Sequence, residues 1–457
     1  MKQEFNAVRT SLAVAAALLV SQGALASGYN FGTQSAAGQG TANANGAEAA
    51  DASVIYANPA GMSRLKGTNV TQVIDLVLPT VEFSQSGSPT GKVYAAPTTP
   101  VTFPITGSNG GDPVHSTFVP HLYVTHQIDD RLAVGLGVFV PFGAKVEFDD
   151  QFIGRYYGQK TELKTIDINP SISYKLNEQH SFGFGLDAQY MKAKLQRKVA
   201  TASTPVSAAG RAGAADATFN VEGDSWGYGF NAGYLFQLDQ GTRFGVAYRS
   251  AIRQNNKGEA KVTLPTGTVL PQADARANVK TPDSLSLNAY HDINETWSVM
   301  GDVTFTKHSH LDQIVIDAQP ITTTYMQTNW KDTFKASIGA TYRLSQAIKL
   351  RAGYAYDQSP STYDSEVLPT MPDNDRQWLS VGGNWKLDDK NSVDFAYSYI
   401  FVRDRHMDRS YDSSTTADRP QGVTTYDPSI GGTSYGRVQG TFRSHAQIFG
   451  VQWNHAF

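Results

Sequence analysis

The chain has 457 residues, a net charge of −3 and no cysteine, and only 17 % of its residues are charged. This charge balance gives no sign of a nucleic-acid partner. The lack of cysteine excludes disulfides, thiolate-bound zinc, iron–sulfur clusters and thiol catalysis. The mean hydropathy of −0.34 argues against a bundle of membrane helices, so the chain forms soluble domains or one large barrel.

The first 26 residues have the pattern of a secretory signal peptide. Lys2 and Arg9 are basic, residues 12–20 are apolar, and Ala24-Leu25-Ala26 places small residues at the cleavage positions. A short anchor helix is the alternative, but nine apolar residues cannot cross ~30 Å of hydrocarbon. We therefore expect cleavage after Ala26 and a mature chain outside the cytoplasm.

The next segment, residues 27–68, lacks strand periodicity and is rich in Gly, Ala and Asn. A flexible tail is one interpretation. Against it, residues 47–52 can form a helical turn beside the apolar residues 54–56, and Asn58-Pro59 indicates a turn. We expect a compact plug, because a wide barrel encloses a lumen that side chains alone do not fill.

Residues 69–457 alternate between apolar and polar positions with period two, which is typical of strands with one apolar face. Strands of ~10 residues that are apolar outside and polar or glycine inside are the signature of an outer-membrane barrel. A soluble β-sandwich is the alternative, but its strands average only about five to six residues. The clearest examples are residues 166–174, 182–190, 226–236, 334–342 and 393–401.

The connections between these strands are alternately long and short, as in bacterial barrels with long extracellular loops and tight periplasmic turns. Seven long and six short connections predict fourteen antiparallel strands, and the barrel must close because an open edge in lipid leaves backbone groups unpaired. The fold class is therefore all-β, in the outer membrane of a Gram-negative bacterium. The short connections are 129–130, 177–179, 239–241, 294–295, 345–346 and 388–391; the long ones are 84–116, 149–161, 200–222, 262–280, 318–329, 359–374 and 410–436.

The third strand is interrupted by Val140-Pro141-Phe142-Gly143. Proline removes a donor from the hydrogen-bond ladder and glycine often marks a bulge, so this strand is expected to kink. A simple distortion at the extracellular rim is the alternative.

Two motifs lie far apart in the chain: Asn58-Pro59-Ala60-Gly61, and Asp375-Arg376 followed by Trp378-Leu379-Ser380. With shorter matches across the mature chain, they resemble the outer-membrane long-chain fatty-acid transporter family (FadL/TodX/OmpP1). The resemblance implies a fourteen-stranded transmembrane barrel of residues 69–457 whose lumen is plugged by an N-terminal hatch of residues 27–68. In this comparison, residues 58–61 form the hatch motif.

The resemblance also implies passive import of a hydrophobic molecule, for which a long-chain fatty acid is the first expectation. Arg197 and Lys331 match basic residues that hold the ligand head group, although ion pairs among loop charges are the alternative for both. The kink at residues 140–143 matches a strand distortion through which ligand leaves sideways into the outer leaflet. Val140 stands where the family places a serine, which leaves room for a less polar ligand.

Three alternatives remain open on sequence grounds: a channel for aromatic or aliphatic hydrocarbons, a general diffusion porin, and an outer-membrane hydrolase. No nucleophile elbow or paired-carboxylate pattern supports an enzyme, so none is expected, nor is a cofactor or a bound metal. His308 and His310 could ligate a metal, but such a pair near a strand end is more often simply polar surface. The expected partners are a hydrophobic ligand and outer-membrane lipid, the protein is expected to be a monomer, and loops 200–222 and 262–280 are expected to form the entry groove.

Overall fold

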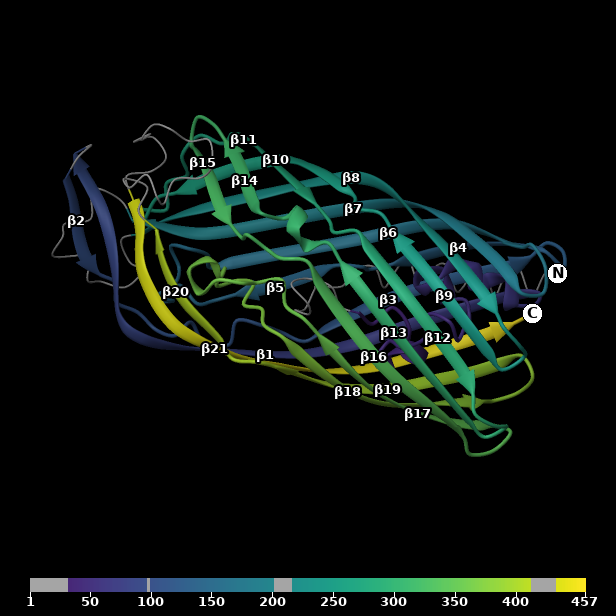
Figure 1. Ribbon diagram of the computed structural model, residues 1–457. Coiled ribbons are helices and arrows are strands. Elements are labelled where there is room, and N and C mark those ends of the chain that lie inside the picture. Colours follow the sequence, from purple (N-terminus) through teal and green to yellow (C-terminus); the bar gives the residue numbers. More distant parts are fainter. Residues whose placement is uncertain (1–31, 97–98, 201–215, 412–432) are drawn as a thin grey trace.

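The computed structural model describes residues 32–96, 99–200, 216–411 and 433–457 (Figure 1). The predicted signal peptide lies outside these residues. The described helices are short: α2 (Ala36–Gln39), α3 (Val54–Ala57), η2 (Pro59–Arg64), η3 (His308–His310) and η4 (Asp364–Glu366). None of them has the length and apolar character needed to cross a membrane.

Fourteen antiparallel strands form a closed barrel, which confirms the predicted fold class. β1, the first strand, pairs with β21, the last, beginning with Asn69 opposite Ala456. The sheet therefore closes on itself, and its strands find backbone partners within the wall. In chain order the wall consists of β1 (Thr68–Ala96), β3 (Thr117–Gln127), β4 (Leu132–Phe139), β6 (Lys160–Lys175), β7 (His180–Ala200), β8 (Asp216–Gln237), β9 (Thr242–Arg249), β12 (Ser284–Asp292), β13 (Trp297–Thr306), β16 (Thr333–Arg343), β17 (Ile348–Asp357), β18 (Arg376–Lys386), β19 (Asn391–Val402) and β21 (Thr433–Ala456).

All six predicted tight turns fall between consecutive wall strands, at the end of the barrel where the C-terminus lies (Figure 1). Several connections predicted as loops contain strands instead, because their alternating residues pair in hairpins at the opposite end. Residues 201–215 and 412–432 of the predicted loops lie outside the described residues. The additional strands are β2 (Thr99–Pro104), β5 (Gly143–Glu147), β10 (Arg253–Thr263), β11 (Ala273–Lys280), β14 (Gln313–Ala318), β15 (Thr322–Gln327) and β20 (Arg405–Tyr411).

The two faces of the wall follow the period-two alternation of the sequence. On β7, Phe182, Phe184 and Leu186 are exposed on the outside, whereas Asp187 and Gln189 are buried inside. The outward face therefore offers hydrocarbon-compatible side chains to lipid, and the inward face is polar or glycine.

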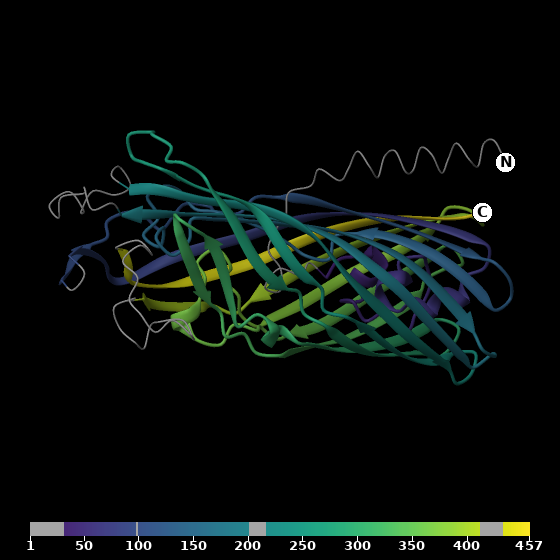
Figure 2. The same ribbon diagram turned by 90° about the horizontal axis from the view of Figure 1, so that it is seen from above.

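The N-terminal segment (residues 32–67) is buried within the barrel, in the half near the C-terminus (Figures 1 and 2). Its side chains and backbone reach strands far apart in the wall. Gln39 Nε2 donates to the Ile448 carbonyl oxygen on β21 at 2.9 Å, and the Gly46 N–H donates to Asp302 Oδ2 on β13 at 2.9 Å. Because these partners lie on separate strands, the segment occupies the lumen rather than lining one side.

Candidate functional site

The Asn58-Pro59-Ala60-Gly61 motif forms the start of η2 and is held against the wall. Asn58 Oδ1 accepts a hydrogen bond from the Ala60 N–H at 3.1 Å, and Asn58 Nδ2 donates to the Tyr234 carbonyl oxygen on β8 at 3.1 Å. Ser173 Oγ on β6 donates to the Ala60 carbonyl oxygen at 3.1 Å. Proline suits this first helical position because its missing N–H would have no intrahelical partner there.

Two inward glycines make room for this turn. Gly183 on β7 and Gly233 on β8 are paired residues of the wall. A β-carbon on Gly183 would lie 2.3 Å from the Ala60 nitrogen, and one on Gly233 would lie 2.1 Å from Asn58 Oδ1. The glycine pattern of these strands therefore reflects close approach of the segment, which periodicity alone could not reveal.

Replacing Gly183 with alanine is expected to push the Pro59–Ala60 turn off the wall while the barrel still forms. The added carbon meets backbone atoms, which cannot rotate away as a side-chain end could. Because the chain lacks cysteine, thiol labelling of a Met62→Cys background reports the change; Met62 is fully buried. Gly301→Ala on β13 is the control, since its β-carbon has only the Ser337 carbonyl oxygen near it, at 3.5 Å, and equal labelling of both variants would contradict the prediction.

The third wall strand is interrupted at residues 140–143, called the kink below. Phe139 at the end of β4 pairs with Asp167, and Gly143 at the start of β5 pairs with Lys164. Four residue steps along the kinked strand (139 to 143) thus oppose three along β6 (167 to 164), so the kink holds one extra residue. Its residues are buried, which places them on the lumen side.

Hydrogen bonds to β3 and to the N-terminal segment hold the kink in place. The Val140 N–H donates to His121 Nδ1 at 3.2 Å, and Gln34 Nε2 donates to the Val140 carbonyl oxygen at 3.2 Å. His121 Nε2 faces Asp75 Oδ2 on β1 at 3.4 Å. The kink, β3 and the segment therefore form one hydrogen-bonded unit, which was not predicted from the sequence.

Beside the kink the wall lacks a ladder. β3 pairs with β4 only over residues 122–127, while its first residues, 117–121, pair with β1 alone among the described strands. Among the described strands, β5 pairs with β6 alone, and at its end the Glu147 N–H donates to the carbonyl oxygen of Pro113, ahead of β3, at 2.7 Å. The wall between β3 and β5 is therefore not joined by backbone pairing at this level.

An apolar cavity of about 130 Å³ lies toward the end with the long connections. The predicted groove region 262–280 contributes to it through β11, while residues 201–215 lie outside the described residues. Its wall includes Leu163, Met191, Leu195, Phe219, Val279, Leu311, Ile314 and Met326. Leu311 and Ile314 also belong to the buried cluster that contains Phe142, so the cavity adjoins the kink.

Of the two predicted head-group residues, Arg197 lines this cavity and Lys331 does not. The Arg197 guanidinium lies 5.2 Å from the centre of the Phe219 ring. Lys331 is exposed and lines none of the cavities described here; its backbone N–H donates to the Pro360 carbonyl oxygen. The structure therefore does not bring the two residues together in one cavity.

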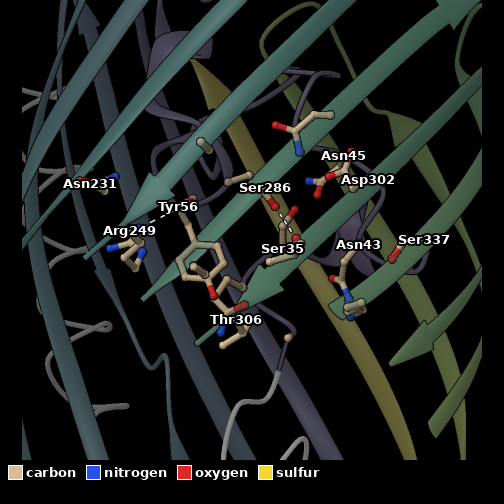
Figure 3. Close-up of a pocket in the computed structure, with 18 of the residues that line it drawn as sticks. Ser35, Asn43, Asn45, Tyr56, Asn231, Arg249, Ser286, Asp302, Thr306 and Ser337 are labelled. Atoms are coloured by element: carbon tan, nitrogen blue, oxygen red, sulfur yellow. Dashed lines mark hydrogen bonds between the residues drawn. The ribbon is translucent and has the colours of Figure 1, made fainter. Parts of the chain in front are cut away.

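A second, polar cavity of about 180 Å³ lies between the N-terminal segment and the wall (Figure 3). Asn43 and Tyr56 of the segment, Arg249 of β9 and Asp302 of β13 are drawn around it in Figure 3. Lys335, Asp357 and Trp378 complete its charged and aromatic lining. One residue in the sequence pointed to this cavity. Lys335 stands at an inward position of the predicted membrane strand 334–342, where a charged side chain is unusual.

Two arginines of the wall hold residues 47 and 48 of the segment. Arg351 Nη1 donates to both carboxylate oxygens of Glu48 at 2.9 Å, and Asp394 lies 3.6 Å from the same guanidinium. Arg243 donates to the Ala47 and Glu48 carbonyl oxygens. This group, the Glu48 clamp below, anchors the segment to the wall.

His308 and His310 take different roles in the structure. His308 is buried, its Nδ1 lies 3.1 Å from Thr333 Oγ1, and burial lowers its pKa to about 4. His310 pairs with Asp283 at 3.2 Å. Among the described residues, no group of three or more His, Cys, Asp or Glu side chains is arranged to hold a metal.

Comparison with known proteins gives a consistent result. The family model described as outer membrane protein transport protein (OMPP1/FadL/TodX) matches residues 17–457. A putative outer membrane protein of Neisseria meningitidis serogroup B is 30 % identical over 467 residues, covering 94 % of this chain and 95 % of the relative. The long-chain fatty acid transport protein of an Escherichia coli strain is 28 % identical over 427 residues, covering 88 % and 92 %.

Solved structures agree on the fold. A FadL homologue from Pseudomonas aeruginosa superimposes with a TM-score of 0.79 at 23 % identity, covering 94 % of this chain and 99 % of the other. The toluene transporter TodX of P. putida superimposes with a TM-score of 0.63 at 20 % identity, covering 89 % and 94 %. At these identities the similarity establishes the barrel architecture alone.

Proposed function

The chain belongs to the outer membrane protein transport protein (OMPP1/FadL/TodX) family of outer-membrane transporters of hydrophobic compounds, and on this premise we propose that it takes up long-chain fatty acids. It is a transport channel of the outer membrane and not an enzyme. The observation that carries the proposal is the apolar cavity with the inward Arg197 on its wall. Burial of each CH₂ group supplies about 0.8 kcal/mol, so the acyl chain can bind without chemical catalysis.

In this proposal, ligand first binds where β7, β8, β10 and β11 surround the apolar cavity. The Arg197 guanidinium meets the carboxylate, since burying an unpaired carboxylate is costly. A sixteen-carbon chain is larger than the cavity, so its passage requires movement of the cluster formed by Phe142, Leu311 and Trp330. Lys331, exposed next to Trp330, is then an outer contact for the head group rather than a cavity residue.

Exit is proposed to occur sideways at the kink, into outer-membrane lipid. The support for this route is the missing ladder between β3 and β5, together with the extra residue in the kink. The N-terminal segment is proposed to act as the hatch, and its Gln34 contact to Val140 links the hatch to the exit. We propose that the monomer carries the complete path.

Replacing Arg197 with methionine is expected to weaken binding of a long-chain fatty acid about ten- to hundredfold, because a charge-assisted hydrogen bond to the carboxylate is lost. Binding of radiolabelled palmitate to the purified protein measures the change. Lys194→Met is the matched control, because Lys194 lies three residues away on the outer face and pairs with Glu222. Equal affinity of the Arg197 variant and the unaltered protein would contradict the role of Arg197.

Uptake of aromatic hydrocarbons is the second candidate function. The volume of the apolar cavity, about 130 Å³, is close to that of an engineered apolar cavity of ~150 Å³ that accepts benzene. Val140 also favours a hydrocarbon ligand, since the valine side chain cannot form a hydrogen bond with a polar head group. Competition between palmitate and toluene for the same site distinguishes the two candidates.

A further inference from the structure

The polar cavity contains a cation without a carboxylate partner. Among the described residues, Arg249 pairs with Asp187, Arg351 with Glu48, and Arg376 with Asp373. Lys335 Nζ has no carboxylate oxygen of a described residue within 4.0 Å; its contact is the Trp378 ring, whose centre lies 4.2 Å away. Asp302 and Asp357 line the same cavity, but neither forms an ion pair with Lys335. A buried cation is costly without a close counter-charge, and a ring face replaces only part of one.

Other donors converge near this ammonium group. A β-carbon placed on Gly32 would lie 3.6 Å from Lys335 Nζ, 3.6 Å from Asn43 Nδ2 and 3.6 Å from the Trp378 ring. Asn43 Nδ2 and Trp378 Nε1 are buried and donate to no described residue. The Lys335 ammonium and the Asn43 amide thus face the same small space beside Gly32. Such a space between donors holds either ordered water or an anion.

His308 adds no positive charge to this cavity. It lines the polar cavity on the side of the cluster formed by Phe142, Leu311 and Trp330, and its ring centre lies 6.0 Å from that of Trp330. Burial lowers its pKa to about 4, so the ring is neutral at neutral pH. Since Arg249 pairs with Asp187, Lys335 is the lining cation that has no described carboxylate within 4.0 Å, while Asp302 and Asp357 line the cavity farther from it.

We propose that Lys335 and Asn43 form an inner site for the carboxylate of an amphiphilic acid, deeper in the barrel than Arg197. This inference rests on the proposed uptake of long-chain acids and adds a second station to it. Gln34 lines the same cavity and donates to the Val140 carbonyl oxygen at 3.2 Å, which connects the cavity to the kink. The acyl chain then extends from the kink region toward the apolar cavity, where Leu311 and Phe142 share a cluster.

The test compares palmitic acid with hexadecanol, which has the same chain length and no carboxylate. The unaltered protein is expected to prefer the acid, and Lys335→Met is expected to reduce that preference about ten- to hundredfold, because a charge-assisted hydrogen bond is lost. Lys335→Arg is expected to restore it. Lys307→Met is the matched control, since that lysine is exposed and lies outside the cavity.

Each outcome decides a specific point. An unchanged acid preference in Lys335→Met, or equal loss in Lys307→Met, would overturn the inner site. Tight but equal binding of acid and alcohol by the unaltered protein would overturn it too, while leaving uptake of hydrophobic compounds intact. Failure to bind either compound would instead defeat the proposed function. If the methionine variant does not fold, as judged by its heat-dependent gel mobility, Lys335→Gln takes its place.

Discussion

Deleting Pro141 is expected to abolish fatty-acid uptake and leave the barrel assembled. The kink holds one residue more than β6 opposite it, so removing one residue restores an unbroken ladder with no change of register on either side. Phe142 then pairs with Thr165 and faces inward, and Val140 faces outward, as the alternation of β6 requires. A continuous strand can also pair with the free edge of β3, which closes the wall at the proposed exit.

Uptake of labelled palmitate by cells that make the deletion variant measures this effect. Assembly is checked by heat-dependent gel mobility and by the amount of protein in the outer membrane. Deleting Ser345 is a suitable control, because that residue lies in a tight turn at the other end of the barrel. Normal uptake by the Pro141 deletion variant would defeat the sideways exit.

Replacing Arg351 with methionine is expected to have the second largest effect. It leaves the Glu48 carboxylate buried without its cation, a change that typically costs about 3–5 kcal/mol. The N-terminal segment is then expected to leave the wall at residues 46–48, which opens the lumen to ions. Conductance of single proteins in planar bilayers should rise from a low level to steady openings.

The double variant Glu48→Gln with Arg351→Met tests the reason for this effect. Glu48 and Arg351 then carry no charge, so the penalty of the lone Glu48 carboxylate disappears, and conductance should fall back toward the low level. Asp394, which also faces Arg351, keeps its hydrogen bond from Asn454 Nδ2 at 2.8 Å in both variants. Equal conductance of the single and double variants would show that the ion pair does not hold the segment. Large steady conductance of the unaltered protein would favour a general porin and defeat the plugged channel.

The barrel could be predicted from the sequence because period-two alternation is a local property. The Phe182–Leu186 stretch shows its outward face in five residues, and the tight turns follow from polar pairs such as Asp129-Asp130. The outer hairpins were missed because their apolar faces pack on each other rather than on lipid. Ala260 and Ala275, for example, are buried in one cluster with Phe219 of β8 and Ile316 of β14.

The candidate site was only partly predictable, for the opposite reason. Alternation tells which residues face the lumen, but it does not tell which of them meet across it. Asn43 belongs to the N-terminal segment, Lys335 to β16 and Trp378 to β18. Only the closed barrel brings these three side chains to one cavity. The kink was visible as Pro141 and Gly143, whereas its fastening by His121 and Gln34 depends on contacts between distant parts of the chain.

The placement of the N-terminal segment also constrains how the protein is assembled. Gln452, on the last strand, accepts hydrogen bonds from Ser35 Oγ and the Ala37 N–H, and Gln39 donates to Ile448 on that strand. The segment precedes β1, yet part of the surface on which it docks belongs to β21, and Ser35 and Gln452 lie 417 residues apart in the chain. Complete docking of the segment therefore requires that β21 is already in place, so these contacts form late in biogenesis.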